Sequence, residues 1–429
     1  SRTQQGYVVT NATHNAPATI SGQGGSYNVT LTGTLPAAGV AVRAQSGGTA
    51  LVTGKVTASG TAVSLAVPAN TTGADRTVTF EYLWNGTWTK IGDSRTQQGY
   101  KVSAATHTAP ASMFKKVLGN QISVVFFILI ALIIFFSVGA KGFFSAYNLK
   151  SLLQQTAVIG IITVAQTFVI ITSGIDLSQG AIIGLTTLIA SGMMVDLGLP
   201  IGVAVLAALL AAVLVGVVNG FFVAHIGLPA FITTLGTQYI IRSIALLAKG
   251  GNDIYNLPPE ISNFGRGTIG GVFPNLAIIM IVIVVIMHLI LKKFSFGRYV
   301  YACGSNVTAA RFSGVKTKKA IFLVYVLAGF LCGIAGIVMM CRINAGIAVC
   351  GDGYEMNSIC AVVIGGGSLF GGEGSISGAL IGAFIMSVLS TGLQIMGFST
   401  YWQQLITGIV LILAVMVDTI RRRRSQGME

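Results

Sequence analysis

The chain has 429 residues, of which 53% are hydrophobic and only 9% are charged, and its formal net charge is +14. Because soluble proteins usually carry about 25% charged residues, this composition excludes a wholly soluble protein. The positive charge does not indicate nucleic-acid binding, because the basic residues after Met113 cluster at the ends of apolar runs, where membrane topology places them.

Residues 1–112 have an ordinary polar composition. Short runs such as SYNVTLTGTL and TVTFEYLW alternate apolar with polar residues, and turn-forming stretches such as SGQGG and WNGTW separate them. Alternation with a period of two between turns predicts β-strands. About seven such strands predict an all-β, immunoglobulin-like sandwich.

An internal repeat lies within this segment. SRTQQGYVVTNATHNAPA at the start of the chain recurs as SRTQQGYKVSAATHTAPA from Ser94, a period of 93 residues and about the length of one immunoglobulin-like domain. We therefore expect one repeat over 1–93 and the start of a truncated second repeat over 94–112. Because MFKK and the apolar run after it have the pattern of a native start, we expect 1–112 to be a fused module before a membrane domain over 113–429. A genuine N-terminal domain is the alternative.

Apolar runs of about 20 residues recur after Met113, and about 20 helical residues span the core of a bilayer. The expected fold class is an all-α polytopic membrane protein with about ten transmembrane helices, preceded by the all-β sandwich. The predicted spans are 121–140, 152–172, 179–196, 201–224, 230–249, 271–291, 320–341, 355–367, 376–396 and 402–420. The eighth span is short and glycine-rich, so we expect a broken or re-entrant helix that other helices bury.

Three basic regions set the expected orientation. Lys115 and Lys116 precede the first span, the loop over 297–319 is the most basic in the chain, and Arg421 to Arg424 lie in the tail. Ten spans place all three regions on one side, which the positive-inside rule makes the cytoplasm. We therefore expect both termini of the membrane domain to be cytoplasmic.

The stretch ITSGIDLSQGAII lies between two long apolar runs and contains Asp176. Ser178 is expected to start a new helix as its N-cap. The Asp176 carboxylate can accept backbone N–H groups near that helix start, where the helix dipole favours an anion. Contact with a partner or with a transport path is the sharper alternative. A proton relay is disfavoured, because no second acid, Lys or His lies nearby in sequence.

The loop over 297–319 contains SNVTAARFSGVKT, with small residues on a short amphipathic helix flanked by basic residues. Such a helix can fit into a groove on another protein, and a solvated loop is the alternative. Elsewhere, TSGIDLSQGAIIGL faintly resembles GGEGSISGALIGA, as in the inverted repeats of transporters. No nucleotide-binding G-x-x-x-x-G-K-[ST] loop, metal cluster or catalytic motif occurs, so we predict no enzyme activity, no metal and no cofactor.

Five motifs, in this order, resemble the permease subunit of ribose/galactose-type ABC sugar importers: VIITSGIDLSQG, PAFITTLGT, GRYVYACGSNVTAARFSGV, GYEMNSICAVVIGGGSLFGGEGS and YWQQLITGIVLILAVMVD. The resemblance runs from about Met113 to Asp418. It implies a monosaccharide importer of the bacterial inner membrane that forms its path as a dimer with a second permease copy or a paralogue. It also implies a cytoplasmic ABC ATPase, which binds the ATP, and a periplasmic or lipoprotein sugar-binding protein.

The resemblance also implies roles for individual residues. The ATPase is expected to dock on a coupling loop with the residues Asn306, Ala309, Ala310, Arg311, Ser313 and Gly314. A helix break that shapes the gate or the coupling surface is expected at Gly174, Asp176 and Ser178. Candidates for lining the path are Gln166, Asn219, Thr233, Thr234 and Gln238.

Three alternatives stay open. Related permeases carry furanone signals, nucleosides or branched-chain amino acids, and the sequence does not name the solute. An ion-coupled secondary transporter would need intramembrane acids, which we do not find in the sequence. A chimeric display protein, whose function is that of the sandwich, is the third.

Overall fold

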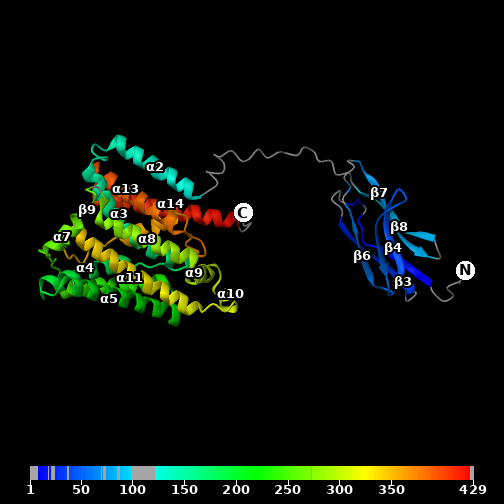
Figure 1. Cartoon of the computed structure of the whole chain (residues 1–429), viewed down its shortest axis with the longest axis horizontal. Coiled ribbons are helices and arrows are strands. Elements are labelled where there is room, and N and C mark those ends of the chain that lie inside the picture. Colours follow the sequence, from blue (N-terminus) through cyan, green and yellow to red (C-terminus); the bar gives the residue numbers. More distant parts are fainter. Residues whose placement is uncertain are drawn as a thin grey trace. The chain divides into compact units, whose positions relative to one another are not determined.

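The structure is a computed structural model, and it describes residues 8–17, 19–20, 25–35, 38–68, 70, 74–84, 87–97, 121–271 and 273–425. Contacts divide the chain into two compact units, Ser1–Pro110 and Ala111–Glu429, here called the β unit and the helical unit (Figure 1). The expected start at Met113, the Lys115–Lys116 pair and residues 98–112 of the expected second repeat lie outside the described residues.

The β unit contains two sheets. One has the strand order β1-β3-β6 and the other β2-β8-β7-β4-β5, and all neighbours are antiparallel except β2 and β8. The described strands are β1 (Val8–His14), β2 (Thr19–Ile20), β3 (Gly25–Thr34), β4 (Val40–Ser46), β5 (Thr49–Val56), β6 (Ala62–Val67), β7 (Arg76–Trp84) and β8 (Thr87–Gln97). Leu31 of β3 shares a buried cluster with Val42 of β4 and Phe80 of β7, so the two sheets pack face to face. The predicted β-sheet architecture is confirmed.

The last strand of the β unit extends into the second copy of the sequence repeat. β8 continues to Gln97, and its Thr96 pairs with Thr77 of β7 and with Thr19 of β2. The start of the second copy, from Ser94 to Gln97, therefore completes the sheet of the first domain. The repeat boundary in the sequence is not a boundary between folds.

The helical unit has apolar helices at all ten predicted positions. They are α2 (Gln121–Gly139), α3 (Ala146–Ile171), α4 (Gln179–Val195), α5 (Ile201–Gly220), α6 (Ala230–Ala248), α8 (Asn275–Lys293), α11 (Thr317–Ile343), α12 (Tyr354–Ile364), α13 (Ile376–Ile395) and α14 (Thr400–Ser425). Among the described residues, seven of these helices are long and apolar enough to cross a membrane, and α2, α4 and α12 are shorter apolar helices. The predicted multi-pass helical fold is confirmed, with α12 as the short eighth segment.

Shorter elements connect these helices. They are the π-helix η1 (Phe221–Ile226), α7 (Pro259–Arg266), β9 (Thr268–Ile269), β10 (Phe273–Pro274), α9 (Ser295–Ser305) and α10 (Val307–Phe312). η1 continues α5 to Ile226, close to the predicted end of this span at residue 224. Gly227 ends it in the left-handed conformation, with φ of 87°.

α3 lies at the centre of the unit. Of the residues in its apolar, membrane-spanning stretch 89% are buried, against 22% for the corresponding stretch of α6. α11 packs along α5 at very short range. A Cβ at Gly216 of α5 would lie 2.5 Å from the carbonyl oxygen of Tyr325 and 3.1 Å from Cα of Val326. The missing side chain therefore lets the two helices touch, as small residues do between membrane helices.

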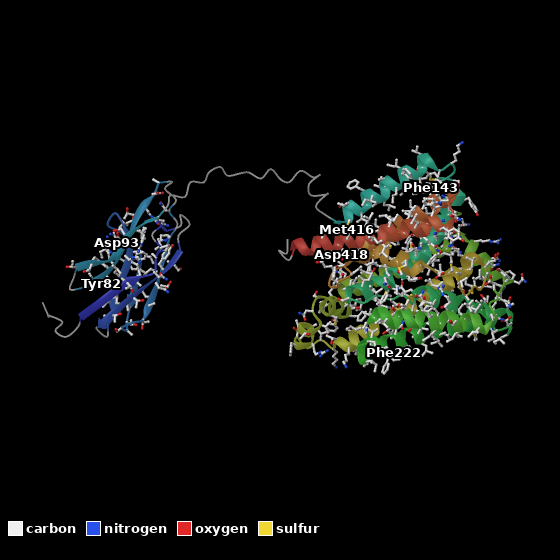
Figure 2. The ribbon with its side chains drawn as sticks, turned by 180° about the vertical axis from the view of Figure 1, so that it is seen from behind. Tyr82, Asp93, Phe143, Phe222, Met416 and Asp418 are labelled. Carbon is white, nitrogen blue, oxygen red and sulfur yellow. The ribbon has the colours of Figure 1, made fainter. Side chains whose placement is uncertain are left out.

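The two ends of the helical unit carry different elements. In Figure 1, α9, α10 and the C-terminal end of α14 lie at one end, and α7 and β9 lie at the opposite end. The coupling loop and the basic tail are thus on the same side of the bundle. Apolar side chains such as Phe222 and Met416 are exposed on its outer helices (Figure 2), which suits a protein surrounded by lipid.

Candidate functional site

Residues 172–178 form a non-helical break between α3 and α4. Asp176 lies buried in this break with 1% of its surface exposed. Its Oδ1 atom accepts hydrogen bonds from the Ser178 backbone N–H at 2.9 Å and from the Ser178 hydroxyl at 2.6 Å. Asp176 therefore accepts a backbone N–H at the helix start, as expected. The expected N-cap by the Ser178 side chain is wrong, because its hydroxyl turns to Asp176 and makes no cap hydrogen bond to α4.

Two further side chains fasten the break to neighbouring helices. Asn219 of α5 donates its Nδ2 to the Ser178 hydroxyl at 2.9 Å. Thr234 of α6 accepts from the N–H of Leu177 and donates to the carbonyl of Ile175, both at 3.1 Å. Asn219 and Thr234, two candidates for lining the path, thus hold the break in place.

The other path candidates lie apart from one another. Gln166 is fully buried in α3, and neither atom of its carboxamide has a hydrogen-bond partner in the described structure. Thr233 donates to the Pro229 carbonyl of its own helix. Gln238 donates to Oε1 of Glu355 at 3.4 Å. The structure therefore does not bring the five candidates together along one surface.

The coupling loop, residues 297–319, contains α10 and most of α9. Asn306 caps α10 by accepting a hydrogen bond from the N–H of Ala309 at 2.9 Å. Arg311, Ser313, Gly314 and Ala309 are exposed. Ala310 is buried, with 5% of its surface exposed. Of the expected coupling residues, Ala310 is the one whose side of α10 packs inside the helical unit.

Next to this loop, three segments meet in what we call the junction: the ends of α3 and α9 and the glycine-rich loop between α12 and α13. Ser173 donates its hydroxyl to the carbonyl of Phe370 at 2.9 Å and to that of Gly304 at 3.3 Å. The N–H of Gly372 donates to the Ile171 carbonyl at 2.9 Å. The break after α3, the glycine-rich loop and α9 are therefore bonded to one another; the break and this loop are called the two breaks below.

The junction leaves no room for side chains. A Cβ at Gly304 would collide with the Ile171 carbonyl oxygen and the Gly372 nitrogen. Tyr301 of α9 also donates its hydroxyl to the Gly374 carbonyl at 2.6 Å. Burial raises the pKa of the Tyr301 phenol, which keeps it protonated and able to donate. The junction is thus a close-packed, hydrogen-bonded connection between α9 and both breaks.

A polar cluster that the sequence reasoning missed joins α6 to the start of α12; we call it the α6–α12 cluster. Arg242 of α6 pairs with Asp352 at 2.6 Å, and Gln238 bonds to Glu355. Arg242 Nε and Nη2 and Glu355 Oε2 are buried without hydrogen-bond partners among the described residues. Arg242 and Glu355 fall inside predicted spans. Charged residues within spans suggest function, so the sequence could have indicated this cluster.

The same cluster corrects the expectation about acids. Glu355 has 4% of its surface exposed. A Cβ at Gly180 would collide with its Oε2 atom, so this carboxylate lies beside the first turn of α4. A second acid is therefore near the start of α4 in space, although it is far from Asp176 in sequence. No group of three or more His, Cys, Asp or Glu side chains suited to a metal ion occurs within the described residues.

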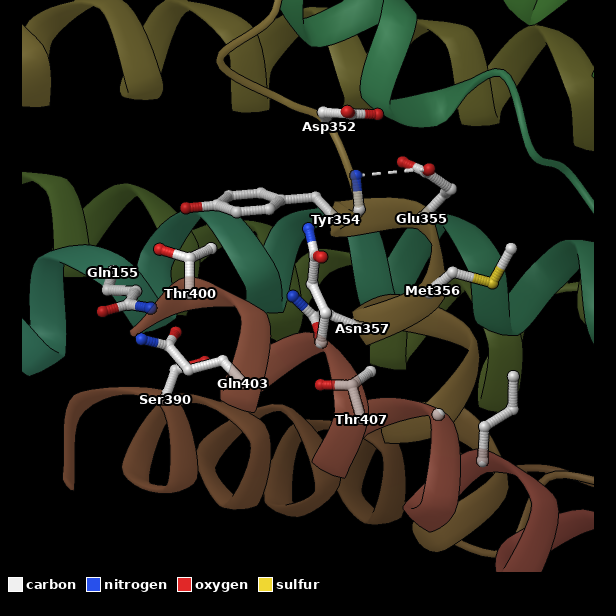
Figure 3. Close-up of a pocket in the computed structure, with 14 residues that line it drawn as sticks. Gln155, Asp352, Tyr354, Glu355, Met356, Asn357, Ser390, Thr400, Gln403 and Thr407 are labelled. Atoms are coloured by element: carbon white, nitrogen blue, oxygen red, sulfur yellow. Dashed lines mark hydrogen bonds between the residues drawn. The ribbon is translucent and has the colours of Figure 1, made fainter. Parts of the chain in front are cut away.

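A cavity of about 460 Å³ lies between α3, α12, α13 and α14 (Figure 3). Figure 3 shows Gln155, Thr400 and Gln403 around the same space as Asn357. The lining residues are Gln155, Asp352, Gly353, Tyr354, Glu355, Met356, Asn357, Ser390, Thr400, Gln403, Gln404, Thr407, Gly408 and Leu411. α3 and three consecutive later helices build this cavity, so its lining residues lie on several elements and no single sequence motif contains them.

Comparison with known proteins assigns the helical unit. A family model described as branched-chain amino acid transport system / permease component matches residues 148–415. The ribose import permease protein RbsC of Bacillus subtilis is 39% identical over 292 residues, which cover 68% of this chain and 90% of that protein. The fructose import permease protein FrcC of Rhizobium meliloti is 38% identical over 298 residues, covering 68% and 83%.

The xylose transport system permease protein XylH of Escherichia coli is 31% identical over 386 residues, which cover 76% of this chain and 98% of that protein. No solved structure matches the chain. The residues that the family model matches all lie within the helical unit.

Proposed function

The chain belongs to the family of transport-system permease components, and on this premise we propose that its helical unit is the membrane-spanning subunit of an ATP-driven monosaccharide importer. The resemblance to ribose-type permeases predicted by the five motifs is confirmed, and the chain is a transport subunit and not an enzyme. The observation that carries the proposal is the 39% identity over 90% of a ribose import permease. Fructose and xylose permeases match over 83% and 98% of their lengths.

The coupling loop is the proposed docking site of a cytoplasmic ABC ATPase. Ala309, Arg311, Ser313 and Gly314 are exposed there, and the Asn306 cap fixes the start of α10. α9 leads from this loop into the junction. Movement of the loop would therefore act on the break after α3 and on the glycine-rich loop through the hydrogen bonds of Ser173 and Tyr301 and the close packing at Gly304.

The break at Gly174, Asp176 and Ser178 is the proposed moving part of the gate. The Asp176 carboxylate accepts its hydrogen bonds from Ser178 within the break itself, so a shift of the break leaves this buried carboxylate satisfied. Gln238 is the path candidate that belongs to the α6–α12 cluster.

The remaining partners follow from the same function. A periplasmic or lipoprotein sugar-binding protein would deliver the solute to the end that carries α7, and a second permease copy or a paralogue would complete the path. We place the protein in the bacterial inner membrane, with both termini of the permease part in the cytoplasm. Residues 1–112 are a separate module, proposed to be fused to it.

Another small solute is the second candidate, because the family model is described by branched-chain amino acids. The test is uptake into proteoliposomes that contain the full chain, the co-expressed ATPase and the sugar-binding protein. We expect uptake of one of ribose, fructose or xylose that requires ATP. ATP-driven uptake of leucine and of no sugar would support the second candidate. Uptake without the ATPase would overturn both and favour an ion-coupled transporter.

A further inference from the structure

The first turns of α14 carry a polar stripe ahead of the apolar run over 409–417. Thr400, Gln403 and Thr407 recur at helical spacing and line the cavity. The outward side of the same turns exposes Trp402 and Leu405. Polar side chains are costly in hydrocarbon and face an aqueous or ligand-filled space when they occur there. The stripe therefore indicates that the cavity accepts polar molecules.

The cavity lies at the end of the bundle away from the coupling loop. It is lined by Gln155 in the first half of α3 and by Ser390 near the end of α13. The other end of α3 reaches the junction with α9. In the proposed orientation, the cavity is therefore in the external half, where a delivered solute would enter.

Apart from Asp352 and Glu355, which interact with Arg242 and Gln238 of α6, the lining groups are uncharged and suit a molecule with many hydroxyls. Gln155, Asn357 and Gln403 offer carboxamides, which donate and accept hydrogen bonds as sugar hydroxyls do. Tyr354 adds an aromatic ring. No Lys, Arg or His is among the lining residues, so the carboxylate of an amino acid would have no cation to pair with. The volume of about 460 Å³ is in the usual range for small-molecule sites.

Several of these groups are free to bind. Gln155 uses its Oε1 to accept from the Thr391 hydroxyl at 3.2 Å, which leaves its Nε2 facing the cavity residues. Within the part of the chain that the structure describes, no hydrogen bond engages the side chains of Asn357 or Gln403. Unpartnered carboxamides that converge on one space are the arrangement expected of an empty polar site.

We propose that this cavity is a monosaccharide-binding site within the protomer, at which the sugar pauses on entry to the path. The proposal rests on the proposed function. It also gives the α6–α12 cluster a role, because Tyr354 and Asn357 line the cavity beside Asp352 and Glu355, which α6 holds in place. A sugar bound there would therefore contact the start of α12, whose other end leads into the glycine-rich loop of the junction.

The test compares Asn357→Leu and Gln403→Leu with a control, Gln394→Leu. Gln394 is exposed at the end of α13 and does not line the cavity. The readout is sugar uptake by proteoliposomes with the full chain, its ATPase and its binding protein, over a series of concentrations of loaded binding protein. Co-purification of the ATPase reports folding and assembly.

Each cavity variant is expected to assemble and to reduce sugar uptake by about three- to tenfold, the usual effect of one lost hydrogen bond. Gln394→Leu should match the wild type. Wild-type sugar uptake in both cavity variants would overturn the binding site and leave the proposed function standing. Absence of ATP-driven sugar uptake in the wild type would overturn the proposed function itself. If either cavity variant fails to assemble, Thr407→Val replaces it with the same expected loss.

Discussion

The two ends of the helical unit differ in packing: the junction is closely packed, and the opposite end contains an open polar cavity. At the junction, backbone atoms of α3, α9 and the glycine-rich loop touch, and no space remains even for a Cβ at Gly304. At the cavity, polar side chains from four helices surround an open volume and several lack partners. The difference indicates that one end transmits movement and the other exchanges a ligand. α12 connects the two, because it begins at the cavity and leads into the junction loop.

The largest effect is expected from filling the junction. Gly304→Val places a side chain against the Ile171 carbonyl and should abolish uptake and lower the melting temperature of the solubilised protein, because backbone on both sides must move. Gly236→Val in α6, where a Cβ meets no atom within 4 Å, is the control. Equal activity of the two variants would mean that the junction is not tight.

The coupling loop gives the next effect. Ala309→Arg puts a long cation on the exposed side of α10 and should reduce co-purification of the ATPase by about tenfold or more, because it clashes in a close-fitting groove. Asn263→Arg, exposed in α7 at the opposite end, should have no effect on co-purification. Ala310→Arg should destabilise the fold, since Ala310 is buried. Undiminished co-purification with Ala309→Arg would show that α10 is not the docking helix.

The buried break is expected to show a moderate loss of stability. Asp176→Ala removes the acceptor for the N–H and hydroxyl of Ser178 and should cost about 1–3 kcal/mol of unfolding free energy. Asp176→Asn keeps an acceptor oxygen and should cost less. Thermal unfolding of the solubilised full chain measures both. An equal loss in the two variants would argue against the hydrogen-bonding role.

The smallest effect is expected at Tyr301. Tyr301→Phe removes its hydrogen bond to the Gly374 carbonyl and should reduce uptake by about two- to fivefold. Burial raises the folded-state pKa of this phenol, so its stabilising contribution is complete below the unfolded pKa and is lost only as the pH rises through the folded one. The ratio of variant to wild-type uptake should therefore be constant between about pH 6 and 9. A ratio that changes in this window would contradict a neutral donor.

The sequence predicted the elements well because hydropathy follows directly from residue type. Every predicted span has its helix. α3 begins at Ala146, six residues earlier than expected. Hydropathy missed this start because its first turns contain the polar residues Asn148 and Lys150. The eighth span was also correctly predicted to be short. The order of the five motifs was sufficient to identify the family.

The sites were less predictable, because they depend on which helices meet. Ala310 and Ala309 are adjacent and chemically identical, and only packing decides which one is exposed. Glu355 lies far from Asp176 in sequence, so its place beside α4 could not be deduced from spacing. The junction also brings together residues more than 100 positions apart, such as Ser173 and Gly304.

The most direct test of the whole account is to express the full chain in its native host, extract it gently and identify what co-purifies by mass spectrometry. The account predicts a stoichiometric ATPase with a Walker loop, retained by the wild type and lost with Ala309→Arg. A chain that is purified alone and moves solute in liposomes without ATP would contradict it. Asp176 and Glu355 would then be candidates for an ion-coupling site.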